Sequence, residues 1–198
     1  MSEDIPPPLI LASHNLGKIR EFQAVLGHQW QVLPQAELGV GDAEETGSTF
    51  VENALIKARH ACSQAHCAAL ADDSGLVVPA LGGAPGLRSS RYSGGDDEAN
   101  NVLLLRNMST LEAKDRAAFY VAVVVLLKHA EDPTPLIAEG RWHGSIATAP
   151  RGTGGFGYDP LFLPDGYEQH AAELSSEEKN RVSHRALAVK QLLQQLTT

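Results

Sequence analysis

Short apolar runs alternate with amphipathic stretches in the first part of the chain. The run Leu9–Ala12 predicts a buried strand, and apolar positions at helical intervals follow it from Ile19 to Leu26. Trp30–Leu33 predicts a second strand. A strand, a helix and another strand in succession predict a βαβ unit, and therefore a sheet that begins with parallel strands.

A polar turn, Ser13–Lys18, separates the first predicted strand from the first predicted helix. At such a turn the backbone N–H groups and the positive end of the helix dipole point at whatever sits above it. Lys18 adds a full positive charge there. The turn is therefore a candidate anion site, and capping of the helix by Ser13 or Asn15 is the simpler interpretation of the same residues.

The pattern Thr49-x-x-Glu52 is a capping box and predicts the start of a second helix. The loop before it carries an acidic cluster, Asp42-Ala43-Glu44-Glu45-Thr46-Gly47. Apolar residues define one face of this helix, and polar residues at helical intervals define the opposite face: Asn53, Lys57 and His60.

The apolar run Ala68–Ala71 predicts a buried strand that stops abruptly at two adjacent carboxylates, Asp72 and Asp73. Adjacent acids at a strand end repel each other unless a cation is present. Two interpretations remain: a polar turn, which Asp, Ser and Gly all favour, and a site for a hard divalent cation. Strand character resumes at Leu76–Val78.

Two long β-rich segments follow in the second half of the chain. Arg116–Lys128 is rich in valine and aromatic residues and predicts a central strand, and Leu136–Thr148 predicts its hairpin partner. A hairpin in a chain that begins with βαβ units predicts a mixed sheet. The expected fold class is therefore α/β, with a mixed central sheet flanked by helices.

The glycine-rich stretch Pro150–Pro160 contains a literal G-x-G-x-x-G. A dinucleotide-binding loop of this kind must open a helix, and Pro160 prevents one from forming. We therefore expect a flexible cradle that presents Phe156 as a stacking platform. A loop leaving a hairpin with one buried aromatic residue is the alternative.

Ser175-x-x-Glu178 is another capping box, and an amphipathic helix ends the chain. On one continuous helix, Lys179, His184 and Arg185 would point in different directions. A helix break at Ser183, with Ser183 capping a new helix, would let the three converge.

Composition narrows the class of protein. The chain has 198 residues, a net charge of −8 and two cysteines. Net negative charge argues against binding to a nucleic acid polymer, and two cysteines without metal spacing suit a reducing compartment. The longest apolar run is too short to span a bilayer. We expect a cytoplasmic protein with a flexible leader at residues 1–8 and a single two-lobed domain at 9–198.

Five short motifs, in order and at compatible spacing, resemble the inosine triphosphate pyrophosphatase family from about Leu9 to Leu196. They are Ser13-x-Asn15-x-x-Lys18, Glu44-Glu45-Thr46-Gly47, Ala71-Asp72-Asp73-Ser74-Gly75, Gly152-Thr153-Gly154-Gly155-Phe156-Gly157-Tyr158-Asp159-Pro160 and Ser183-His184-Arg185. His14 is a departure, because relatives often have glycine there. The family pattern leaves this position open.

The resemblance implies an elongated two-lobed fold with the active-site cleft between the lobes, a homodimer, and Mg2+-dependent hydrolysis of non-canonical purine nucleoside triphosphates (dITP, ITP, XTP) to the monophosphate and pyrophosphate. It implies that Asp73 is the general base and, with Glu45, a metal ligand. The substrate-binding residues that it implies are Ser13, His14, Asn15, Leu16, Gly17, Lys18, Ser74, Phe156, Gly157, Tyr158, Asp159, Lys179, His184 and Arg185.

The residues support this chemistry independently of the resemblance. Triphosphate cleavage depends mainly on charge neutralisation, and the chain offers carboxylate ligands for Mg2+, a helix N-terminus and Lys18. Two alternatives remain: a pyrophosphatase for modified pyrimidine triphosphates on a similar fold, and a catalytically silent nucleotide-binding module. The acidic pairs argue against the silent module, because carboxylates hinder triphosphate binding unless a metal ion is recruited.

Overall fold

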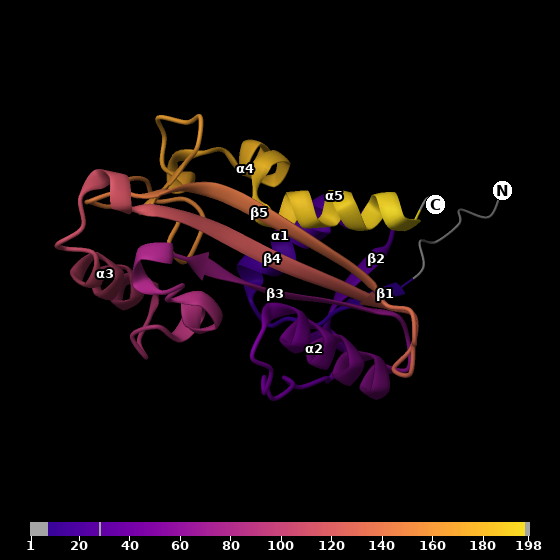
Figure 1. The fold of residues 1–198 in the computed structure, drawn as a ribbon. Helices are drawn as coiled ribbons and strands as arrows, with labels where there is room; N and C mark the ends of the chain where they lie inside the picture. Colours follow the sequence, from indigo (N-terminus) through magenta and orange to yellow (C-terminus); the bar gives the residue numbers. More distant parts are fainter. Residues whose placement is uncertain (1–7, 28, 197–198) are drawn as a thin grey trace. The chain divides into compact units, whose positions relative to one another are not determined.

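A six-stranded sheet runs through the molecule in the order β2-β1-β3-β4-β5-β6 (Figure 1). The computed structural model describes residues 8–27 and 29–196. The strands are β1 (Pro8–Leu11), β2 (Gln31–Pro34), β3 (Ala69–Val77), β4 (Ala117–Leu127), β5 (Leu136–Ile146) and β6 (Phe162–Pro164). Because β1 pairs in parallel with β2 and β3 while β5 and β6 are antiparallel, the predicted mixed sheet is confirmed.

Four of the α-helices, α1 to α4, begin at a side-chain cap that the local sequence supplies. Asn15, Thr49, Asp96 and Ser175 each accept a hydrogen bond from a backbone N–H of the first turn. The α-helices are α1 (Leu16–Leu26), α2 (Phe50–Ala65), α3 (Asp97–Asn107), α4 (Ser176–Val182) and α5 (His184–Leu196). Short 3-10 helices are η1 (Gln35–Leu38), η2 (Pro79–Leu81), η3 (Gly86–Arg91), η4 (Ala113–Asp115) and η5 (Ala171–Glu173).

The chain divides into two compact units. Unit 1 comprises the chain up to Asp73, Val123–Gly140 and the residues from Arg185 onward, and unit 2 comprises Ser74–Ala122 and Arg141–His184. The expectation of one two-lobed domain over residues 9–198 remains a prediction. The predicted leader lies outside the described residues except for Pro8, which belongs to β1 and pairs with Gln31.

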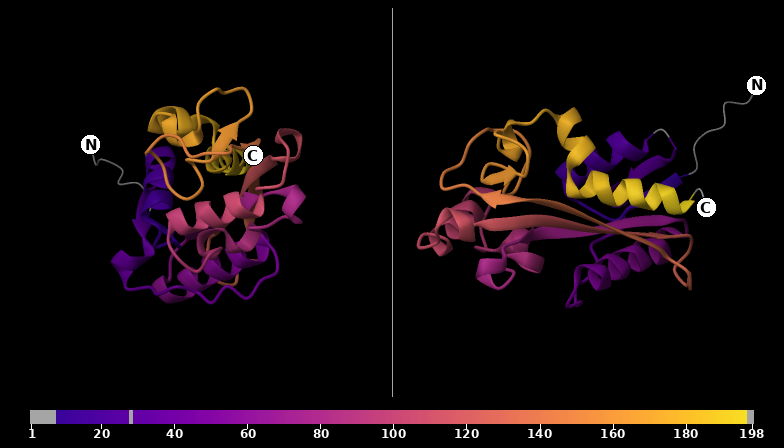
Figure 2. Two further views of the ribbon diagram at one scale, coloured as in Figure 1. Left: turned by 90° about the vertical axis from the view of Figure 1, so that its left-hand side faces the viewer. Right: turned by 45° about the horizontal axis from the view of Figure 1, so that its top comes forward.

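In unit 1, helix α2 covers one face of the sheet with small side chains. Its buried residues pack against apolar residues of β1, β3 and β4, in a cluster that includes Ile10, Ala54, Ala58, Ala61, Ala71, Val123 and Val125. Helix α5 lies alongside β5 (Figure 2), where Gln195 Nε2 donates to the Ile137 carbonyl at 2.9 Å. The alanine-rich face lets α2 approach the strands closely, which brings its polar residues near the sheet.

Unit 2 has a separate core built largely from aromatic side chains. Tyr120 packs edge-on against Phe162 with ring centroids 4.8 Å apart, and Trp142 lies 5.2 Å from the same ring. Leu104 and Met108 bring α3 onto this cluster. Together with β6, which is too short to be recognised by its pattern, this core positions the glycine-rich loop.

Strand β3 differs from the sequence prediction at a functionally important point. The strand does not stop at Asp72 but continues to Val77, so both the predicted stop and the polar-turn interpretation are wrong. The physical reason is charge compensation: each carboxylate is paired with a cation supplied from elsewhere in the chain. Among the residues described, no helix is long and apolar enough to cross a membrane.

Candidate active site

Asp72 and Asp73 face opposite sides of the sheet, because successive residues of a strand alternate. Asp72 meets cations from α1 and α5, whereas Asp73 meets polar residues from α2. Adjacent carboxylates thus occupy different environments within unit 1.

Asp72 is the centre of a buried ion network. Its Oδ2 lies 2.7 Å from Lys18 Nζ and 3.4 Å from Arg185 Nε, and its side chain has no exposed surface. Arg185 also places Nη1 2.8 Å from Glu21 Oε2. Burial alone would raise the pKa of Asp72, but the Lys18 and Arg185 charges outweigh burial and hold this pKa well below its usual range. Asp72 is therefore ionised at neutral pH.

Asp73 is held by two residues of α2. Lys57 Nζ lies 2.9 Å from Asp73 Oδ1, and Asn53 Nδ2 donates to Asp73 Oδ2 at 3.2 Å. Burial raises the pKa of Asp73, and the charge of Lys57 offsets this rise only in part. A carboxylate with a raised pKa is a stronger base than a free aspartate, so Asp73 is suited to accept a proton.

Glu45 converges on the same cation as Asp73. Its Oε1 lies 3.1 Å from Lys57 Nζ, so one ammonium group bridges the two carboxylates that the sequence predicts as metal ligands. Within the described part of the chain, no three His, Cys, Asp or Glu side chains gather into a metal-binding group. Two carboxylates around a positive charge nevertheless fit Mg2+, which binds one or two carboxylates and completes its shell with substrate phosphates and water.

The turn before α1 has the local geometry of a helix N-terminus. Asn15 Oδ1 accepts from the Lys18 N–H at 3.1 Å, and Ser13 Oγ accepts from the Asn15 N–H at 3.1 Å. Leu16 and Gly17 occupy the first turn of the helix. Lys18 turns its ammonium group toward Asp72, so its positive charge is anchored before any anion binds.

In unit 2, a lysine lies between an aromatic ring and a carboxylate. Lys179 Nζ is 2.6 Å from Asp159 Oδ2 and 4.7 Å from the centre of the Phe156 ring. Asp159 Oδ2 also accepts from the Phe156 N–H at 2.9 Å. The buried Asp159–Lys179 pair therefore fixes the backbone that carries the predicted stacking residue.

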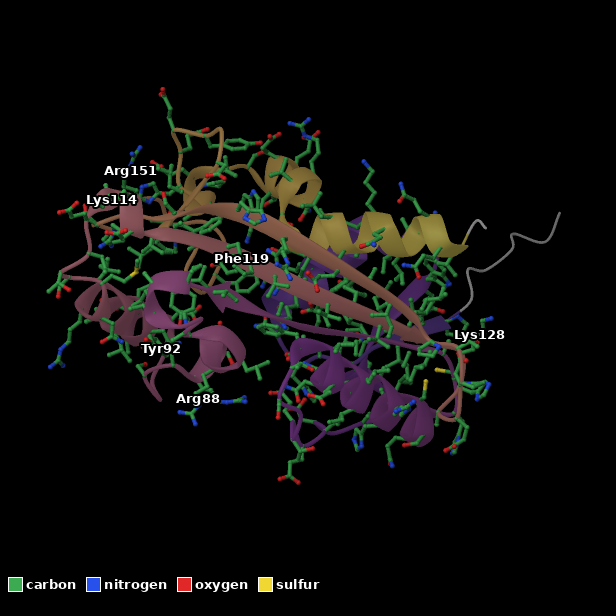
Figure 3. The ribbon with its side chains drawn as sticks, viewed as in Figure 1. Arg88, Tyr92, Lys114, Phe119, Lys128 and Arg151 are labelled. Carbon is green, nitrogen blue, oxygen red and sulfur yellow. The ribbon has the colours of Figure 1, made fainter. Side chains whose placement is uncertain are left out.

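The glycine-rich loop is anchored rather than free. Gly154 N–H donates to the Ala172 carbonyl at 3.0 Å, and Gly157 N–H donates to Asp97 Oδ2 at 2.7 Å. Gly155 has φ +72°, and a side chain there would collide with Asp159 Oδ2. Arg151, labelled in Figure 3, ties the start of the loop to η5 through Glu173, 3.1 Å away.

The remaining predicted residues of unit 2 are also placed. The Tyr158 hydroxyl donates to the Ser89 carbonyl at 2.8 Å, and Ser74 lies partly buried in β3. The His184 ring stacks on Tyr120 with centroids 4.7 Å apart. Ser183 has extended backbone angles between α4 and α5, so the helix does break there, a question that the sequence left open. Convergence of Lys179, His184 and Arg185 remains a prediction.

Sequence reasoning did not include Asn53 and Lys57 among the site residues. Both contact Asp73, and Asn53 Oδ1 also accepts from the Gly47 N–H at 2.8 Å, which holds the end of the acidic loop. The available signal was their four-residue spacing on the polar face of α2, directly after the acidic cluster. That spacing could not show which carboxylate they meet.

Comparison with known proteins agrees with the motifs. A family model described as the Ham1 family matches residues 9–195. The dITP/XTP pyrophosphatase of Xanthomonas campestris pv. campestris strain 8004 is 57% identical over 191 residues, which cover 95% of this chain and 96% of that protein. The dITP/XTP pyrophosphatase of Legionella pneumophila strain Lens is 53% identical over 186 residues, covering 93% and 95%.

Solved structures show the same fold. A HAM1 protein from Coxiella burnetii matches with a TM-score of 0.88 at 46% identity, covering 96% of this chain and 98% of that chain. A dITP/XTP pyrophosphatase from Mycobacterium abscessus matches with a TM-score of 0.74 at 43% identity, covering 94% and 98%. The resemblance inferred from the five motifs and the mixed α/β fold class are both confirmed.

Proposed function

The chain belongs to the Ham1 family, and on this premise we propose that it hydrolyses non-canonical purine nucleoside triphosphates to the monophosphate and pyrophosphate. The relatives named dITP/XTP pyrophosphatase support the substrate class. The observation that carries the proposal is the cluster of Asp73, Glu45 and Lys57, in which a buried base adjoins a second carboxylate and a cation.

Asp73 is the general base in this proposal. Water adds across the anhydride bond between the α- and β-phosphates, and Asp73 accepts the proton that the water loses. The raised pKa of Asp73, caused by burial, favours this transfer. Asn53 and Lys57 hold the carboxylate in place, and the α1 N-terminus with Lys18 binds the phosphate chain.

Mg2+ is part of the proposal. Glu45 and Asp73 would hold it together with oxygens of the triphosphate. When bound, the ion neutralises charge that develops on the phosphate oxygens. The ammonium group of Lys57, which contacts both carboxylates, supports a cation between them.

In this proposal Arg185 selects the base, and Phe156 stacks on it without selecting. Hypoxanthine presents an acceptor at O6, whereas adenine presents a donor there, so a fixed donor such as Arg185 distinguishes the two. Phe156 would stack on either purine without choosing. Arg185→Ala should lower activity on ITP more than on ATP, whereas Phe156→Ala should lower both. An unchanged ITP-to-ATP ratio in Arg185→Ala would assign Arg185 only to its pairing with Glu21 and Asp72.

One experiment tests the reaction and its cofactor together. Pyrophosphate release is measured from dITP, ITP, XTP, ATP, dTTP and UTP, with Mg2+ and with EDTA. We expect fast release from the first three nucleotides only, and only with Mg2+. Fastest release from dTTP or UTP would point to a pyrimidine enzyme, and binding without turnover would indicate a silent module.

A homodimer and a cytoplasmic location also belong to this proposal. The family resemblance supports the first, and the free cysteines Cys62 and Cys67 suit a reducing compartment. Light scattering coupled to gel filtration measures the oligomeric state, and cell fractionation measures the location.

A further inference from the structure

The segment 39–48, which carries Glu45, has no helix or strand of its own. Its position therefore depends on side chains that reach it from other elements. Helix α2 supplies two of these attachments. At residues 45–47, Lys57 Nζ lies 3.1 Å from Glu45 Oε1 and Asn53 Oδ1 accepts from the Gly47 N–H at 2.8 Å. At Gly41, His60 Nε2 lies 3.1 Å from the carbonyl oxygen. A third attachment, next to Gly41, comes from outside α2.

The third attachment joins the segment to the turn before α1. His14 Nδ1 lies 2.6 Å from Asp42 Oδ1, and Gln35 Nε2 lies 2.8 Å from the same oxygen and 2.9 Å from the same ring nitrogen. A ring nitrogen this close to a carboxylate must carry a proton, so Nδ1–H donates to Asp42. The Gln35 amide then gives its hydrogen bond to the carboxylate as well.

The three residues of this cluster differ in burial: Gln35 is buried, whereas His14 and Asp42 are exposed. Gln35 is only 3% exposed, and a buried amide keeps its hydrogen-bond partner. The side chains of His14 and Asp42 are 41% and 73% exposed. Gln35 therefore anchors the carboxylate of Asp42, and His14 connects it to the phosphate-binding turn.

We propose that His14, Gln35 and Asp42 form a clasp that positions the Glu45 loop against the start of α1. His14 is then a positioning residue, not a substrate contact, and its importance for metal binding rests on the proposed function. Loss of the clasp lets segment 39–48 shift, so Glu45 meets Asp73 less often in the arrangement that binds Mg2+.

The test compares His14→Ala with the parent protein in three measurements. Backbone amide exchange over residues 39–48, measured without metal or nucleotide, should become faster. The Mg2+ concentration for half-maximal ITP hydrolysis should rise by about tenfold, the lower end for residues that support metal ligands. Binding of the α,β-methylene analogue of ITP in EDTA should stay within twofold, because the clasp does not touch phosphate.

Four further variants sharpen the comparison. Asp42→Ala should reproduce His14→Ala, and the double variant should be no worse than either single variant because both remove one contact. Asp42→Asn keeps an acceptor for Nδ1–H and should recover most of the parent behaviour. His129→Ala removes an exposed histidine of the β4–β5 connection and should change none of the readouts.

The amide-exchange result is independent of catalysis, so it separates this proposal from the proposed function. Faster exchange in a protein that hydrolyses no nucleotide would support the clasp and overturn the activity. Weaker binding of the analogue in EDTA with unchanged exchange would make His14 a substrate contact and overturn the clasp. Unchanged exchange and unchanged Mg2+ dependence would also overturn it.

Discussion

Asp72 and Asp73 are neighbours in one strand, and the structure gives them opposite surroundings. Asp72 has no exposed side-chain surface and meets two cations, whereas Asp73 is 11% exposed and meets one cation and an amide. The pKa of Asp72 is lowered despite burial, and that of Asp73 is raised by burial. The difference suits Asp72 to hold other residues in place and Asp73 to exchange a proton.

On the proposed function, charge compensation rather than residue type decides which of the two carboxylates accepts the proton. Both are aspartates of β3, and alternation alone sends them to different helices. If this is correct, substitution of Asp72 should mainly lower folding stability, whereas substitution of Asp73 should mainly lower turnover.

The largest expected effect is on folding stability, in Asp72→Asn. Asparagine keeps the shape but leaves Lys18 and Arg185 without their shared anion. Removing one partner from a buried ion network costs about 3–5 kcal/mol, because the remaining charges stay buried. Chemical denaturation measures this loss. A free energy of unfolding equal to that of the parent would contradict the structural role of Asp72.

The same variant should also change how folding stability depends on pH. The folded pKa of Asp72 lies below its unfolded value of about 3.9, so the contribution of the pair is complete above that pH and is lost as pH falls toward the folded pKa. Asp72→Asn should therefore lose less stability than the parent between neutral and acidic pH. If the free energy of unfolding falls equally steeply with decreasing pH in both proteins, another titrating group determines the loss of stability in acid.

The next effect is on turnover, in Asp73→Asn. Asparagine cannot accept a proton from water, so kcat for ITP should fall by at least ~100-fold. The fold should persist, because Lys57 keeps its contact with Glu45. Unfolding midpoints of variant and parent provide the control, and turnover within a few-fold of the parent would remove Asp73 from the mechanism.

A smaller effect should appear in the pH profile of Lys57→Ala. Lys57 lowers the pKa of Asp73 against the effect of burial, so its removal should raise that pKa. The acidic limb of the kcat/KM profile should then move to higher pH. Lys57→Arg keeps the charge and should leave the limb in place. A limb that moves to lower pH, or does not move, would assign it to another group.

The smallest effect should follow from an exposed ion pair. Arg181 Nη2 lies 2.7 Å from Glu178 Oε1 on α4, with the Arg181 side chain 73% exposed. Exposed pairs contribute little, so Arg181→Ala should leave the denaturation midpoint unchanged. A shift as large as that of Asp72→Asn would show that burial is not what distinguishes the networks.

Local signals in the sequence predicted local structure well. The capping residues Asn15, Thr49 and Ser175 begin helices as expected, because a cap needs only partners two or three residues away. The continuation of β3 could not be predicted in this way, since Asp72 is compensated by Arg185, 113 residues further along the chain. Strand β6 depends in the same manner on its pairing with β5.

In the candidate site, too, contacts between residues far apart in the sequence could not be predicted. Asp73 and Glu45 were predicted through the family resemblance, because each lies in one of the five matched motifs, whereas Lys57 became recognisable only when its contacts with both were known. His14 was expected to contact substrate, but sequence gave no reason to connect it with Asp42, 28 residues away. Only the structure shows which residues of distant segments contact each other.

Gly155 has a consequence for directed evolution of this enzyme. Any side chain there would displace Asp159, and with it the partner of Lys179. A saturation library screened for turnover should therefore return almost only the parental residue at this position. If substitutions at Gly155 are tolerated, turnover does not require the Asp159–Lys179 pair. Gly155 therefore tests the importance of this pair although it has no functional group itself.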